Sequence, residues 1–216
     1  CLDNLNPKYL GISALDAGSY NETFALAGVY TDQIVNQMKK LDDSFLWNST
    51  DGLGALTSGS TAGVVVPAAA TGSVETGTIL GIIDELIFAS SDDDIADRDD
   101  LTVWMSVASF RKYVTALRTL NNFYFDPSSV ENRHGILQMA YPFMGNVKVV
   151  GTAGITGERI ALMPDAYAVV GTDLLSDVTN FSLWYDINAD QLKHRLKSKL
   201  GVQVAFPEYI TSNDRN

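Results

Sequence analysis

The sequence is poor in the residues that build disulfide frameworks and metal centres. Among 216 residues there is one cysteine, Cys1, and there are two histidines, His134 and His194. A single thiol excludes a disulfide framework, and so few thiols and imidazoles do not indicate a structural zinc site. A disulfide-stabilised secreted protein does not fit this composition, and we expect an origin inside a cell or a virion.

Long apolar runs are also missing. No run approaches the ~20 residues that a membrane-spanning helix needs, and the longest candidates, residues 78–89 and 63–70, are short and interrupted. The sequence shows no signal peptide, so we expect no membrane partner. It also begins with cysteine rather than methionine, from which we expect the chain to start inside a longer product.

Positive charge is scarce and unevenly distributed. The chain has 15 Lys and Arg against 26 Asp and Glu, a net charge of −11. Residues 1–100 contain 16 acidic and 4 basic residues, whereas residues 101–216 contain 10 acidic and 11 basic residues. Because nucleic-acid binding depends on Lys and Arg at phosphates, we do not expect the whole surface to coat nucleic acid. The charge balance leaves open the possibility that a local basic face binds nucleic acid.

Sequence motifs of catalysis are few. No P-loop, no His-Glu-x-x-His and no Gly-x-Ser-x-Gly occurs. Gly151, Gly154 and Gly157 have the spacing of a dinucleotide-binding loop, but the residues that follow, 158–163, predict a strand rather than a helix. We therefore predict a glycine-rich hairpin loop there and no cofactor.

The histidines give no further support to catalysis. His134 and His194 lie about 60 residues apart, in a predicted loop and on a predicted strand, while the plentiful Ser and Asp leave a Ser-His-Asp arrangement open. We assign no catalytic residue and predict that the protein is not an enzyme.

Apolar residues at three- and four-residue steps predict a long helix over residues 19–48. Ser19 and Glu22 form a capping box at its start, and turn residues at 49–52 follow its end. Its apolar stripe contains Phe24, Ala27, Tyr30, Ile34, Met38, Leu41 and Phe45. Such a long helix with a narrow stripe is expected to lie across a large structure.

The rest of the chain predicts shorter elements and an α+β fold. A second helix begins near residue 76 or 78 and has its buried side at Ile79, Ile82, Ile83, Leu86 and Ile87. A buried strand is predicted over 101–105, and Ser106 caps a third helix that carries Lys112 on its outer side. A polar loop over 121–135 precedes short strands at 136–140, 147–150, 160–163 and 167–170.

The last part of the chain has a period of two. Leu192, His194, Leu196, Ser198, Leu200, Val202, Val204 and Phe206 alternate with Lys193, Arg195, Lys197 and Lys199. A helix would scatter the basic residues around its axis, whereas a strand places all four on one face. We therefore predict one long strand over about 190 to 206, ended by Pro207.

The basic face of this strand has two interpretations. It is either a solvated surface or one that faces a negative partner, such as an acidic surface of another subunit or packaged nucleic acid. Six of the nine residues from 92 to 100 are Asp. The candidate electrostatic interface consists of Lys193, Arg195, Lys197 and Lys199 with Asp92, Asp93 and Asp94. The three aspartates could also bind a divalent cation, but their spacing favours a solvated acidic turn, so we assign no metal site.

Several segments in this order resemble the major capsid protein of tailed bacteriophages, which has the Hong Kong 97-type fold. The segments that carry the resemblance are LWNSTDG at 46–52, LTVWMS at 101–106, VKVVG at 147–151, RIALMPDAYAVVGTD at 159–173 and KLGVQVAFPE at 199–208. The resemblance covers roughly residues 20–210 and depends on element order rather than on an invariant motif.

The resemblance implies a domain organisation. After an irregular segment at 1–18, residues 19–54 and 179–210 would form a peripheral domain with a spine helix at 19–48 and a long return strand. Residues 55–178 would form an axial domain, and 211–216 a tail. The N-terminal arm and extended loop of the family precede the spine helix, so this chain looks like an incomplete capsid subunit.

The function implied is structural. Copies would form pentamers and hexamers of an icosahedral phage head around double-stranded DNA, assembled in the host cytoplasm and found in the virion. Partners would be other copies, packaged DNA at the inner surface, and minor capsid or decoration proteins. Two alternatives remain, namely an encapsulin-like shell that packs enzymes and, from a different class, a soluble α+β hydrolase or ligand-binding protein.

Overall fold

The computed structural model describes residues 21–90, 98–120, 130–133, 136–172, 180–186, 191–197 and 200–215. The chain divides into two units, Cys1–Asp42 and Asp43–Asn216. In the first unit the described part is helical. Helix α2 spans Asn21–Asn48 and so continues into the second unit. The long predicted helix is confirmed from Asn21 onward, while its capping residue Ser19 lies outside the described residues.

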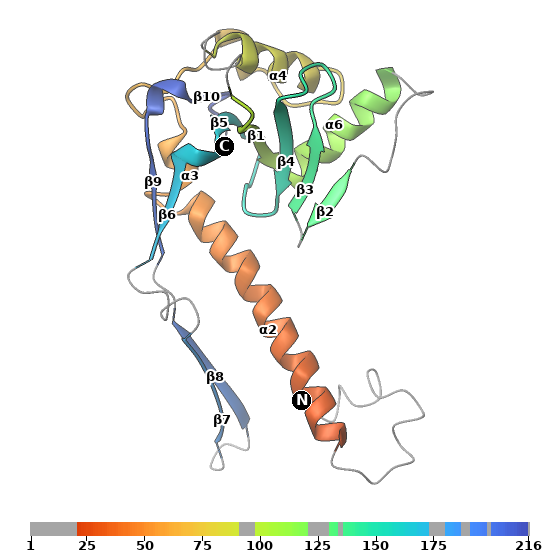
Figure 1. Ribbon diagram of the computed structural model, residues 1–216, viewed down its shortest axis with the longest axis vertical. Helices are drawn as coiled ribbons and strands as arrows, with labels where there is room; N and C mark the ends of the chain where they lie inside the picture. The colour runs from red at the N-terminus through yellow and green to blue at the C-terminus, as the bar shows by residue number, and fades with distance from the viewer. Residues whose placement is uncertain are drawn as a thin grey trace. The chain divides into compact units, whose positions relative to one another are not determined.

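The second unit is built on a six-stranded sheet with the order β10-β5-β1-β4-β3-β2. β1 (Leu101–Ser106) lies between β4 (Val147–Thr152), which is parallel to it, and β5 (Ile160–Pro164), which is antiparallel. β3 (Ile136–Ala140), β2 (Glu131–Arg133) and β10 (Thr211–Ser212) extend the sheet by antiparallel pairs (Figure 1). Mixed pairing with two helices against the sheet confirms the predicted α+β class.

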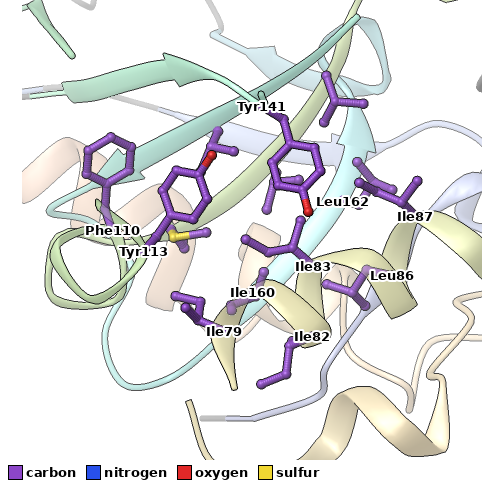
Figure 2. Close-up of a cluster of buried hydrophobic side chains, with 14 of the residues drawn as sticks. Ile79, Ile82, Ile83, Leu86, Ile87, Phe110, Tyr113, Tyr141, Ile160 and Leu162 are labelled. Atoms are coloured by element: carbon purple, nitrogen blue, oxygen red, sulfur yellow. The ribbon is translucent and has the colours of Figure 1, made fainter. Parts of the chain in front are cut away.

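One face of the sheet is covered by two helices, α4 (Ile79–Phe88) and α6 (Val107–Leu120). The five residues predicted for the buried side of the second helix are all buried in α4. They pack against Phe110, Tyr113, Tyr141, Ile160 and Leu162 (Figure 2). The cap of α6 is also confirmed, since Ser106 Oγ accepts a hydrogen bond from Ser109 N at 3.2 Å. This cluster is the main hydrophobic core.

A second, smaller core contains side chains from the other face of the sheet. Because side chains alternate along a strand, Leu101, Val103 and Met105 of β1 belong to the first cluster, and Trp104 packs against the second. Trp104 lies 5.7 Å from Trp47, between ring centroids. Leu53 of the short helix α3 (Leu53–Leu56) and Ile210 complete this core. It fixes the C-terminal turn of α2 to the sheet.

The prediction of a single long strand over 190–206 is wrong. This segment instead contributes strands to two separate two-stranded ribbons. β8 (Gln191–Lys197) pairs with β7 (Asn180–Asp186), whereas β9 (Gly201–Val204) pairs with β6 (Ala168–Gly171). Alternation in the sequence indicates an extended backbone, but it does not tell which segment supplies the hydrogen bonds. The partner strand changes between residues 197 and 201, so the segment is divided.

Three further predictions need correction. The glycine-rich segment after β4 is not a hairpin loop, because β1 lies between β4 and β5 in the sheet. The polar segment 121–135 contains strand β2, which is stabilised by pairing with β3 despite its polar sequence. Lys112 is half-buried rather than fully outward, because its ammonium group donates a 2.6 Å hydrogen bond to Val74 O.

Candidate interaction surfaces

The predicted electrostatic interface is only partly covered by the described residues. Lys193, Arg195 and Lys197 occupy alternate positions of β8, as predicted from the period of two. In the register of the ribbon they lie opposite Trp184, Ser182 and Asn180, respectively. Lys199, Asp92, Asp93 and Asp94 lie outside the described residues. The pairing between the basic and acidic segments therefore stays a prediction.

The ribbon of β6 and β9 carries exposed large apolar side chains that sequence reasoning missed. Val169 and Val170 are each 51% exposed and Phe206 is 55% exposed. Phe206 follows β9 with a φ of 55°, in the left-handed region that non-glycine residues rarely adopt. Its ring lies 5.3 Å from that of Tyr167, which also lies under the guanidinium of Arg98 at 4.5 Å. Phe206 is thus held at the surface by its aromatic neighbours Tyr167 and Tyr209, whereas Val169 and Val170, adjacent in β6, point to opposite faces of the ribbon.

The three glycines of the segment 151–157 have structural roles, which do not require a bound phosphate. A Cβ atom at Gly151 would lie 2.7 Å from the Cβ of Phe110, so glycine permits the close approach of α6 to β4. At Gly154 a Cβ atom would lie 2.5 Å from the backbone oxygen of Asp43. Gly157 has a φ of 75°, which favours glycine. Packing and backbone conformation therefore account for the spacing of the three glycines.

The carboxylate that this segment binds is Asp43 of the chain itself. Asp43 Oδ2 accepts hydrogen bonds from Thr152 Oγ1 at 2.5 Å and from Gly154 N at 2.7 Å. Asn48 adds two further bonds, since its Nδ2 donates to Gly154 O at 2.5 Å and its Oδ1 accepts from Thr156 Oγ1 at 3.0 Å. These bonds join the last two turns of α2 to the loop after β4. We call this set of contacts the Asp43 clamp.

A pocket of about 480 Å³ lies beside the clamp. Its lining includes the side chains of Trp47, Ser49, Thr50, Thr156 and Arg159. Arg159 is only 7% exposed, and its guanidinium donates a hydrogen bond to Gly54 O. Burial lowers the pKa of Arg159, an effect that the negative charge of Asp214 opposes. The residues that line the pocket thus include a buried arginine, several serines and threonines, and a tryptophan.

Buried tyrosines lie between the two helices on the opposite face of the sheet. Tyr141 donates a hydrogen bond to Asp84 Oδ1 at 2.5 Å, and its ring stacks on that of Tyr113 at 6.3 Å. Burial raises the pKa of both phenols, and the nearby Asp84 carboxylate raises that of Tyr141 further. Both groups are therefore neutral across the physiological range. Their arrangement serves packing between α4, α6 and the end of β3.

The described ranges contain no cluster of His, Cys, Asp and Glu arranged to bind a metal ion. His134 lies outside them, and for His194 only the backbone is described, opposite Leu183 in the β7–β8 ribbon. A Ser-His-Asp arrangement is thus not tested by the structure. Among the described helices, none is long and apolar enough to span a membrane.

The similarity of this chain to known proteins lies in structure rather than in sequence. The sequence matches no protein-family model and none of the curated proteins with which it was compared. Among solved structures, the chain is similar to the crystal structure of a virus-like particle from Pyrococcus furiosus, with 11% sequence identity and a TM-score of 0.43. The similarity covers 80% of this chain and 62% of that chain, so this chain spans about three fifths of the other's length. At this TM-score the similarity carries no argument by itself.

Proposed function

We propose that the protein is the structural subunit of a closed shell and works by assembling with copies of itself. The observation that carries the proposal is the exposure of large apolar side chains on and beside the β6–β9 ribbon, where Val169 and Val170, on opposite faces of β6, and Phe206, which follows β9, are each about half exposed. Exposed apolar side chains on a two-stranded ribbon promote association. Burial against a second copy would remove these side chains from water.

The sequence resemblance supports a finer form of this proposal. In that form the chain has the Hong Kong 97-type fold, with the peripheral and axial domains set out above, and forms pentamers and hexamers of a phage head around double-stranded DNA. The virion location, the minor or decoration proteins and the DNA contact all belong to this form. An encapsulin-like shell fits the described residues about equally well, and the content of purified particles, DNA or enzyme, would distinguish the two.

A second candidate function is ligand binding at the pocket beside the Asp43 clamp. The specific observation is that the buried Arg159 lines this pocket together with Ser49, Thr50 and Thr156. Pockets that bind small molecules have this concave shape with a few converging polar groups. A monodisperse monomer whose thermal stability rises with a small polar ligand would favour this function over a shell.

Light scattering after size exclusion, together with negative-stain electron microscopy of the full-length protein, tests the shell proposal. We expect large closed particles for the wild type and a strong reduction in their yield for Val170→Lys, because the substitution places a charge on the exposed ribbon. Val65→Lys is the matched control, since Val65 is 39% exposed outside the ribbon. A wild-type protein that stays monomeric at high concentration would overturn the proposal.

A further inference from the structure

The pocket beside the Asp43 clamp has a single charged residue in its wall. Its lining comes from the end of α2, from α3 and the turn after it, and from the segment that joins β4 to β5. Among these described lining residues Arg159 alone is ionisable, while the others are apolar or carry hydroxyl or amide groups. The lining therefore contributes one positive charge and no negative charge.

The guanidinium group of Arg159 lies against the part of the wall that Gly54 forms. It donates a hydrogen bond to Gly54 O, and its central carbon lies 3.8 Å from the position that a Cβ atom on Gly54 would take. Gly54 itself lines the pocket. Because Arg159 is buried, its charge is poorly solvated by water, which is why its pKa is lowered. An anion in the pocket would supply the counter-charge that water does not.

One carboxylate near the pocket reduces this attraction. The negative charge of Asp214 raises the pKa of Arg159 against the effect of burial. However, Asp214 Oδ1 accepts hydrogen bonds from Ser58 Oγ at 2.6 Å and from Gly59 N at 3.1 Å, which hold the carboxylate on the turn after α3. Asp214 does not belong to the lining. A ligand in the pocket would therefore contact the arginine and not this carboxylate.

The walls of the pocket are fixed by hydrogen bonds within the protein. Thr156 Oγ1 donates to Asn48 Oδ1 at 3.0 Å and so ties the loop after β4 to the end of α2. Thr61 Oγ1 donates to Ala55 O at 3.0 Å and ties the turn after α3 back to that helix. A pocket whose walls are already ordered binds a ligand without a further cost in chain entropy.

We propose that this pocket binds a small molecule through an anionic oxygen group, a phosphate or a carboxylate, that pairs with Arg159. A guanidinium group suits such groups because its planar N–H donors match two oxygen atoms at once. Ser49 and Thr50 also line the pocket, and hydroxyl groups donate hydrogen bonds to anionic oxygens. The volume of about 480 Å³ accommodates a small metabolite. This inference names the ligand class of the second candidate function and does not depend on shell assembly.

Thermal melts of the full-length protein test the ligand class. The probes are inorganic phosphate, acetate and, as a neutral molecule, glycerol, each titrated at constant ionic strength. We expect phosphate, acetate or both to raise the melting temperature with a saturable dependence on concentration, by about 2–4 °C at five times the dissociation constant. Glycerol should give no saturable rise.

Two substitutions of Ser60 form a matched pair. Ser60 is exposed in the pocket wall, and Ser60→Glu and Ser60→Gln add side chains of the same size that differ by one negative charge. Ser60→Glu should weaken anion binding at least tenfold, because it places a like charge in the same pocket. Ser60→Gln should stay within about threefold of wild type, since it adds no charge. Arg159→Lys, which keeps the charge but loses the planar fork, should also weaken binding, and its melt without anion shows whether it folds.

The outcomes separate specific binding from a general effect of salt. An equal rise in melting temperature for wild type, Ser60→Glu and Ser60→Gln would identify a general salt effect and overturn the proposal. A saturable rise with glycerol as large as that with the anions would also overturn it. Saturation by phosphate alone would assign a phosphate group, and saturation by acetate alone a carboxylate. Light scattering of the same samples tests the shell separately, so particles without anion binding would overturn this inference and leave the shell function in place.

Discussion

Removing the carboxylate of Asp43 is expected to loosen the joint between the end of α2 and the sheet. Asp43→Ala deletes two charge-assisted hydrogen bonds, from Thr152 Oγ1 and Gly154 N. Bonds to charged groups each contribute about 1.5–3 kcal/mol when they are well formed. Gly154 is buried, so its N–H would lose its acceptor without gaining free access to water. Since Asp43 is itself only half-buried, we expect a loss near the lower end, about 2–3 kcal/mol in the free energy of unfolding.

Urea unfolding followed by tryptophan fluorescence measures this loss. Trp47 and Trp104 pack together close to the clamp, so their emission reports on the affected region. Gly154→Ala is expected to act in the same direction, because the added Cβ would lie 2.5 Å from the backbone oxygen of Asp43. Asp51→Ala is the matched control, since Asp51 is an exposed aspartate in the turn just after α2. A change of less than about 0.5 kcal/mol for Asp43→Ala, as expected for surface substitutions, would refute the clamp.

Two further stability predictions follow from the core and from the C-terminal ion pairs. Ile83→Ala leaves a cavity at a fully buried position and should cost about 2–5 kcal/mol of unfolding free energy. Gly81 is exposed on the same helix and has open space around its Cβ position, so Gly81→Ala should stabilise the protein by about 0.5–1 kcal/mol. Equal melting temperatures for the two variants would contradict this prediction. The hydrogen bond from Val74 N, helped by the positive charges of Lys112 and Arg215, lowers the pKa of Glu158, so its stabilising effect is present above the ordinary pKa of 4.5 and is lost as the pH falls through the lowered value. Glu158→Gln should therefore melt below wild type at pH 7, and the difference should shrink as the pH falls below 4.5; an undiminished difference in acid would show that the ion pairs are not its cause.

Individual elements were predictable because their signals are local. Helix α4 shows this most clearly, since the spacing of its isoleucines and leucine identified all five buried residues. Strand β3 was predicted with its observed limits, Ile136–Ala140, from a short run between turn residues. The cap at Ser106 was predicted from residue type alone and is present as a hydrogen bond. In each case the sequence signal lies within a few residues along the chain.

The functional surfaces were less predictable because they join distant segments. The Asp43 clamp connects residues more than 100 positions apart, and no local pattern marks Asp43 as the carboxylate that the glycine-rich segment binds. The exposed valines of β6 lie in a sequence typical of a buried strand. They remain at the surface because β6 pairs with β9 in a two-stranded ribbon. The one long strand predicted at the end of the chain was wrong for the same reason, because its hydrogen-bond partners are set by other segments.

By itself the sequence determined the long helix α2, helices α4 and α6, the α+β class and the alternating basic residues Lys193, Arg195 and Lys197, because helix and strand periods follow from local backbone geometry. Only the tertiary structure decided the order of the strands, the division of the last strand between two ribbons and the contacts of the Asp43 clamp. These depend on which distant segments meet, and so on long-range packing and hydrogen bonding that no local period encodes.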